Sequence, residues 1–153
     1  MNAQQSYREA GVLGASPVEL TIRLYEKMID DLRQVSDAIE KKEVRRRTDR
    51  IKHAILIVGH LESSLDFDRG GKVARNLELL YQTLRCRLLH LQFHPSTQGA
   101  AQLVTDLLAV RQAWVEVQRS ETPAAAPSQR ENGAAAAVYG AANADQAHLD
   151  WRG

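Results

Sequence analysis

Apolar residues recur along this chain at intervals of three and four, the spacing expected for the buried face of an α-helix. Three stretches carry the pattern at about residues 17–42, 44–65 and 71–93, and a fourth follows His94–Ser96 and runs to about residue 120. Runs that alternate apolar and polar residues, as a strand would, are missing. The pattern therefore predicts an all-α protein, and four helices with short connections favour an antiparallel four-helix bundle.

The predicted helix boundaries have local sequence signals. Ser16 and Glu19 form a capping box around Pro17, a residue that suits the first helical position. Gly70–Gly71 supplies the backbone freedom for a sharp turn between the second and third helices. Pro95 ends the third helix, because proline disfavours helical geometry in the residue before it.

The two ends of the chain differ in composition from the predicted bundle domain, residues 16–120. Residues 1–15 are a polar arm with few apolar anchors, Tyr7, Val12 and Leu13. Residues 121–153 are rich in alanine, contain proline and glycine breaks, and have no sustained apolar stripe. We therefore expect a flexible N-terminal arm and a disordered C-terminal tail.

Charge and composition narrow the possible partners and location. A net charge of +1 over 153 residues gives no case for a nucleic acid or an anionic membrane as the main partner. No apolar stretch is long enough to span a bilayer, and the N-terminus lacks the apolar core of a signal peptide. The single cysteine, Cys86, cannot form an internal disulfide, which fits a reducing cytosol.

Motifs for catalysis or metal binding are missing from the sequence. The chain has no Glu-x-x-His pair of a carboxylate di-iron bundle, no Cys-x-x-Cys and no glycine-rich phosphate loop. His90 and His94 have a spacing that can chelate a metal ion, but cationic side chains are also favoured at the end of a helix. We therefore expect a protein that is not an enzyme and has neither cofactor nor metal.

Three helices carry more apolar residues than one buried stripe requires. The third helix has a seam at Val73, Leu77, Leu80, Leu84, Leu88 and Leu91, and a second stripe about opposite, at Leu79, Cys86, Leu89 and Phe93. The first helix adds Leu20, Leu24, Met28 and Val35, and the last adds Val104, Leu108 and Val115. Patterning alone leaves two explanations about even: deeper burial, including burial in a homodimer, or a groove that receives an amphipathic segment.

The predicted turn also carries a longer motif. Residues 61–81 contain Ser-Leu-Asp, then Gly-Gly, then Ala-x-Asn-Leu-x-x-Leu-Tyr, an order that resembles the signature of the FliS-type flagellar secretion chaperones. Further matching pieces, at Ala15–Pro17, Leu24–Tyr25, Arg87–Leu88 and Ala113–Trp114, extend the resemblance to roughly residues 7–114. The connection at residues 94–99 and the tail after Ser120 depart from the family pattern.

The resemblance implies a cytosolic chaperone that binds the C-terminal segment of flagellin, prevents premature polymerisation and escorts it to the flagellar type III export apparatus. The export gate is a further candidate partner. The resemblance favours the groove, with expected flagellin-binding residues Tyr7, Leu13, Leu20, Leu24, Met28, Leu79, Leu89, Phe93, Val104 and Leu108. Structural roles are expected for the signature residues Ser64, Leu65, Asp66, Gly70, Gly71, Asn76, Leu77 and Tyr81, with Asn76 fixing the corner by a hydrogen bond. The competing class is a homodimeric helical bundle with a structural or adaptor role and no flagellin cargo.

Overall fold

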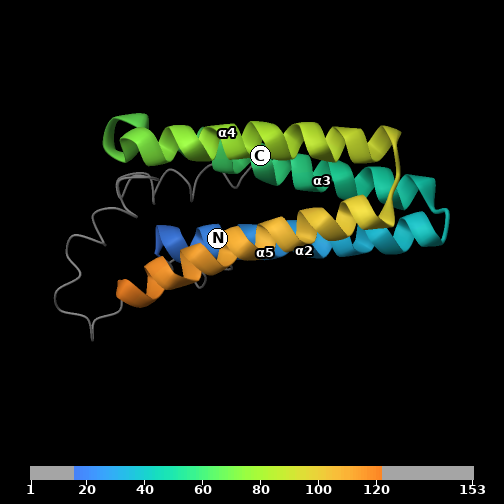
Figure 1. Ribbon diagram of the computed structural model, residues 1–153, viewed down its shortest axis with the longest axis horizontal. Helices are drawn as coiled ribbons and strands as arrows, with labels where there is room; N and C mark the ends of the chain where they lie inside the picture. The colour runs from blue at the N-terminus through green and yellow to red at the C-terminus, as the bar shows by residue number, and fades with distance from the viewer. Residues whose placement is uncertain (1–15, 122–153) are drawn as a thin grey trace, which may run out of the picture.

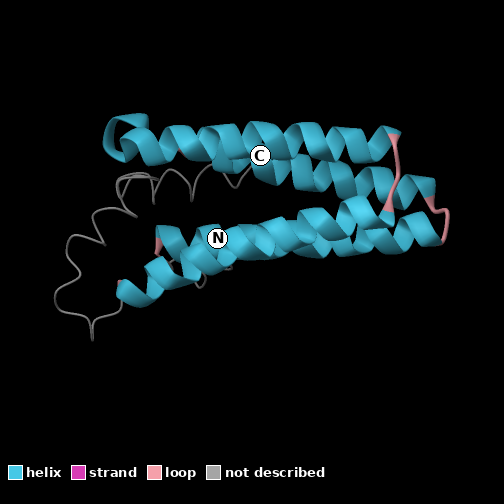
Figure 2. Cartoon of the chain, in the orientation of Figure 1, coloured by secondary structure: helices cyan, strands magenta, loops and turns pink. Residues whose placement is uncertain are grey.

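The computed structural model describes residues 16–121, which form four α-helices and no strand (Figure 1, Figure 2). The helices are α2 (Pro17–Glu40), α3 (Val44–Ser63), α4 (Phe67–Phe93) and α5 (Thr97–Ser120). Consecutive helices run in opposite directions along the long axis and are joined by short connections (Figure 1). The prediction of an all-α, antiparallel four-helix bundle is confirmed. The predicted arm and the tail beyond Glu121 lie outside the described residues.

Side-chain caps begin three of the four helices. Ser16 Oγ accepts a hydrogen bond from the backbone N–H of Glu19 at 3.1 Å, which is one of the two hydrogen bonds of the predicted capping box, and the Glu19 carboxylate pairs with Arg23. Asp66 caps α4 through the N–H of Arg69, and Ser96 caps α5 through the N–H of Gly99, both at 3.0 Å. Each cap satisfies a backbone donor that has no partner within the helix.

The helix α4 begins earlier than the sequence pattern predicts. Residues 67–70 form a first helical turn, and Gly71 then interrupts the helix with φ 52° and ψ −124°. A side chain is disfavoured at that positive φ, whereas glycine tolerates it. The glycine pair therefore lies at a kink inside α4, and residues 64–66 make the connection from α3.

The helices do not pack equally against one another. α2 packs closely against both α5 and α3, and α3 packs against α4. α4 and α5 are not in comparably close backbone contact. In Figure 1 they diverge toward the end of the bundle where α4 begins and α5 ends. The side of the bundle between α4 and α5 is consequently its most open side.

This unequal packing explains why the predicted seam of α4 is only partly buried. Leu84, Leu88 and Leu91 are buried, as expected. Leu77 and Leu80 are half-buried, however, and Val73 is 54% exposed. The first half of α4 packs on α3 while α5 diverges from it, so the face directed toward α5 is incompletely covered.

Three aromatic side chains connect the helices inside the bundle. Tyr25 on α2 and Tyr81 on α4 are fully buried, and Trp114 on α5 is 7% exposed. The Tyr25 hydroxyl donates a hydrogen bond to the Tyr81 hydroxyl at 3.0 Å and also interacts with the Trp114 side chain. We call these three residues the aromatic clasp, because they join the two helices that diverge.

Candidate functional site

The outer face of α4 exposes large apolar side chains. Leu79 is 62% exposed, Leu89 45% and Phe93 76%. They lie about opposite the buried Leu84 and Leu88 on the helix. The predicted second stripe is therefore a surface feature, and Cys86 within it is exposed. We call Leu79, Leu89 and Phe93 the α4 outer face.

A groove of about 740 Å³ lies beside this face, between the second half of α4 and the first turns of α5. Leu79, Leu91 and Leu103 contribute apolar lining, and Cys86 and His90 add polar atoms. Because Leu79 belongs to both features, the groove continues the α4 outer face toward α5. An apolar groove between helices is the kind of surface that receives the apolar face of another helix.

One ion pair joins the two walls of the groove. Arg87 Nη1 on α4 donates to Asp106 Oδ2 on α5 at 2.7 Å, and Gln102 Nε2 donates to the other carboxylate oxygen at 3.0 Å. The hydrogen bond from Arg87, and then that from Gln102, lower the pKa of Asp106 below its ordinary value. Asp106 therefore bridges α4 and α5 as a carboxylate at the exposed edge of the groove.

The groove also contains the histidine pair that the sequence singled out. The rings of His90 and His94 lie 4.7 Å apart between centroids and are tilted by 32°. Among the described residues, no group of three or more histidine, cysteine or acidic side chains is arranged to hold a metal ion. The pair accordingly forms part of the polar wall of the groove.

The structure does not bring all of the expected binding residues onto this surface. Leu24 and Met28 are 5% and 1% exposed, so they belong to the core. Leu20 is half-buried and lies on the same side of α2 as Leu24, four residues on. The physical reason is that α2 packs between two helices, so it needs a wider buried face than a single seam.

Val104 and Leu108 form a separate apolar edge on α5. Val104 is half-buried and Leu108 is 40% exposed. They lie on the side of α5 that faces α2, since Arg111, one turn beyond Leu108, forms an ion pair with Glu26 of α2 at 3.0 Å. The expected residues Tyr7 and Leu13 lie outside the described residues.

Three of the eight signature residues have visible structural roles at the α3–α4 connection. Ser64 Oγ donates to the backbone carbonyl of His60 at 2.8 Å, Leu65 is 8% exposed, and Asp66 caps α4. Asn76 is exposed and makes no hydrogen bond to another described residue. The corner is therefore fixed by Ser64 and Asp66, and not by Asn76 as the sequence suggested.

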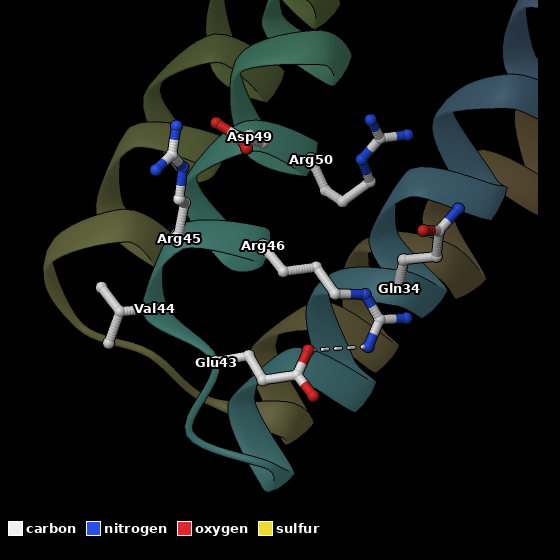
Figure 3. A pocket seen from close by; sticks show the side chains of 7 residues that line it. All are labelled: Gln34, Glu43, Val44, Arg45, Arg46, Asp49 and Arg50. Atoms are coloured by element: carbon white, nitrogen blue, oxygen red, sulfur yellow. Dashed lines mark hydrogen bonds and ion pairs between the residues drawn. The ribbon is translucent and has the colours of Figure 1, made fainter.

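A second concavity, of about 700 Å³, lies at the corner between α2 and α3 (Figure 3). Arg46 pairs with Asp37 at 2.6 Å and with Glu43 at 3.3 Å, as Figure 3 shows for Glu43. Arg50 extends toward α2 and contacts Asp31 at 3.4 Å. Because carboxylates of the same chain already engage these two guanidinium groups, this corner is an ion-paired helix junction.

Sequence reasoning missed the buried carboxylate at this junction. Asp31 is 2% exposed and contacts His53 Nδ1 at 2.6 Å, in addition to Arg50. Desolvation raises the pKa of Asp31, while the hydrogen bond and charge of His53 and the charge of Arg50 act against that rise. Its burial could have been predicted from its position. Asp31 lies three residues after Met28 and four before Val35, and so on the same apolar side of α2.

The four described helices thus define a protein-binding module, with an exposed apolar face and an adjoining groove on its open side. No described helix is both long and apolar enough to cross a membrane. A family model described as "Flagellar protein FliS" matches residues 1–121. The chain belongs to this family, the FliS flagellar secretion chaperones.

Curated relatives agree with that assignment. The chain is 31% identical over 118 residues to the flagellar secretion chaperone FliSB of Pseudomonas aeruginosa, covering 74% of this chain and 94% of the relative. It is 27% identical to FliS of Salmonella typhimurium over 110 residues, covering 71% and 82%. It is 30% identical to FliS of Campylobacter jejuni over 120 residues, covering 78% and 91%. These relatives are named as chaperones, which are not enzymes, and membership implies a flagellar protein as partner.

Proposed function

We propose that this chain is a cytosolic export chaperone that binds the C-terminal segment of flagellin. Binding would keep that segment from polymerising prematurely and would escort the subunit to the flagellar type III export apparatus. The observation that carries the proposal is the α4 outer face, where Leu79, Leu89 and Phe93 are exposed beside a groove in a member of this family. Large apolar side chains exposed together along one helix face, beside an apolar groove, are typical of an interaction site.

The chemistry of the proposed ligand follows from this surface. A segment that is disordered when free and amphipathic when helical can place apolar residues every three or four positions against the groove. Ordering such a segment consumes about 2–5 kcal/mol of the interaction energy. Affinity then stays moderate for a large interface, which suits a cargo that must be released, and we propose the export gate as the partner at release.

The binding surface we propose contains fewer residues of α2 than the sequence suggested. Leu24 and Met28 are excluded by their burial. The separate α5 edge, with Val104 and Leu108, remains in the proposal because a disordered ligand can wrap two patches that are not contiguous. Tyr7, Leu13 and the half-buried Leu20 remain proposed contacts at its N-terminal side.

Calorimetry with the C-terminal segment of flagellin from the same organism tests the proposal through Leu89→Asp. Leu89 is 45% exposed, so the substitution should change the melting temperature little. It should weaken binding at least tenfold, because a carboxylate would be desolvated against an apolar helix without a partner. Unchanged affinity for Leu89→Asp would remove the α4 outer face from the proposal.

Two matched variants separate binding from folding. Leu84→Ala removes a leucine that is 2% exposed on the opposite side of the same helix, and should cost about 2–5 kcal/mol of stability. Leu56→Asp places the same charge on an exposed leucine of α3, away from the groove, and should leave affinity unchanged. If the chain binds no flagellin segment at all while it is folded, the proposed cargo is wrong.

A further inference from the structure

The open side of the bundle continues beyond the groove to the end where α4 begins. There Val73, Leu77 and Leu80 of α4 lie on the same side of the helix as the buried Leu84. Val110 and Val117 of α5 follow the buried Leu103 at intervals of seven, and so continue its face. Val73 is 54% exposed and the other four are half-buried. We call these five residues the α4–α5 valley.

The valley differs from the α4 outer face in its origin. Its side chains lie on the helix faces that also carry buried residues, and four of the five pack against the core while remaining partly exposed. The two helices diverge at this end of the bundle (Figure 1). A short apolar segment laid over the valley would remove its remaining exposed apolar surface from water.

The chain itself supplies a segment at this place. α5 ends at Ser120, at the same end of the bundle as the start of α4, and residues 122–153 follow directly (Figure 1). These 32 residues lie beyond the family match, which stops at residue 121. Their large apolar residues are Val138, Tyr139, Leu149 and Trp151. A role for them is consequently not inherited from the family.

The length of the tail is sufficient for its apolar residues to reach the valley. The 17 residues from Glu121 to Val138 span up to about 55 Å when extended, while α4 is about 40 Å long. A tether of this kind gives an effective concentration near the millimolar range, so even weak anchors are occupied. Lys72, exposed beside Val73, is a cation that Asp150 between Leu149 and Trp151 can pair with.

We propose that residues 138–151 dock in the α4–α5 valley of their own chain. Val138, Tyr139, Leu149 and Trp151 are the apolar anchors, and the contact covers Val73 and its neighbours in the free protein. This intramolecular contact does not depend on flagellin, so it stands or falls separately from the proposed function. It also gives the valley an occupant that any competing ligand has to displace.

Fluorine NMR of the full chain labelled with fluorotryptophan tests the proposal. The chain has two tryptophans, so the Trp151 resonance is assigned by its loss in Trp151→Phe, and buried Trp114 reports on the fold. The Trp151 resonance should be displaced from its position in a free peptide of residues 122–153. Val73→Glu should return it most of the way to the peptide position, whereas Leu56→Glu on α3 should leave it displaced.

A variant in the tail provides a control in case Val73→Glu disturbs the fold of the bundle. Leu149→Asp changes no residue of the bundle. It should also return the Trp151 resonance to the peptide position and leave the Trp114 resonance unchanged. A Trp151 resonance that coincides with the free peptide in the unmodified chain overturns the proposal. Equal responses to Val73→Glu and Leu56→Glu overturn it as well. A displacement that disappears on hundredfold dilution assigns the contact to a second copy and overturns the intramolecular form.

Discussion

The aromatic clasp explains why tyrosine, and not phenylalanine, occupies two positions of the family motif. Tyr25 and Tyr81 follow leucine in the matching pieces of sequence, and Trp114 ends another such piece. Their polar atoms meet inside the bundle, so each buried hydroxyl has a partner. Burial, followed by the influence of Tyr81, raises the pKa of Tyr25 far above its ordinary value, so the hydroxyl stays protonated and can donate.

Replacing Tyr25 by phenylalanine should therefore destabilise the chain without creating a large cavity. The change removes the hydroxyl that contacts both Tyr81 and Trp114, which should cost about 1–3 kcal/mol. Urea unfolding followed by circular dichroism measures the loss, and the dependence of the unfolding free energy on urea concentration should be unchanged. Tyr7→Phe in the arm is the control and should be neutral. A cost for Tyr25→Phe no larger than that of the control would show that the hydroxyl contacts do not matter.

Asp31 should make stability depend on pH in a direction opposite to most carboxylates. Its folded-state pKa is raised, mainly by desolvation, so folding favours the protonated form. The favourable contribution is present below the unfolded pKa, about 4, and is lost as the pH rises through the folded pKa. Asp30 adds to this rise, and His53 and Arg50 oppose it.

The variant Asp31→Asn checks that sign. Its stability relative to the unmodified chain should improve as the pH increases from about 3.5 to 7, because only the unmodified chain loses this contribution. His53→Ala should lower stability at pH 7, since it removes the strongest group that opposes the raised pKa. Urea titrations at several pH values measure both differences. A pH-independent difference for Asp31→Asn would contradict the expected linkage.

At the scale of the helices, replacing Gly59 or Gly71 by alanine should change the stability of the chain in opposite directions. Gly59 lies within α3, where an added Cβ would be 3.9 Å from Arg85 Nη2, an ordinary contact. Gly59→Ala should therefore stabilise the chain by about 0.5–1 kcal/mol. Gly71 has open space around it but a φ of 52°, so Gly71→Ala should destabilise by about 1 kcal/mol or more. Thermal unfolding of the two variants gives both signs, and a stabilising Gly71→Ala would mean the kink is not maintained in solution.

The sequence pattern predicted which residues share a face of a helix, but not which of these faces are covered by other helices. Periodicity and caps placed the four helices, because both depend on residues three or four apart. Leu24 and Val73 were misjudged in opposite directions: the first is buried and the second is exposed. Burial at these positions depends on which helices flank α2 and α4, and on how α5 diverges. The spacing within a single helix contains no information on either.

For the whole molecule, the main alternative to a cargo surface is a homodimer through the same α4 face. A dimer would bury Leu79, Leu89 and Phe93, which are exposed in the single chain. We expect light scattering at low concentration to give the mass of one chain. The proposed function requires this face to be free for flagellin, and a dimer would cover it. If the mass is that of two chains and Leu89→Asp halves it, the dimer is the occupant of this face.

The groove itself was only half predictable. The sequence supplied its α4 side, since Leu79 and Leu89 stand out as surplus to the seam. Its α5 side depends on Leu103 and on the Arg87–Asp106 pair, which join residues 19 positions apart across the helix connection. Arginine and aspartate at that separation have no periodic signal, so only the three-dimensional arrangement identifies them.

The packing of the first described helix against the last has a consequence for how this protein is made. Glu26 and Arg111, which pair across α2 and α5, are 85 residues apart in the chain. The α3–α4 hairpin can form from residues that are close in sequence. The side of α2 that packs against α5 stays uncovered until α5 has left the ribosome. Closing that long loop is entropically slow compared with forming the hairpin. A nascent chain that stalls before residue 97 would therefore expose the apolar flank of α2 to the chaperones that serve all newly made proteins.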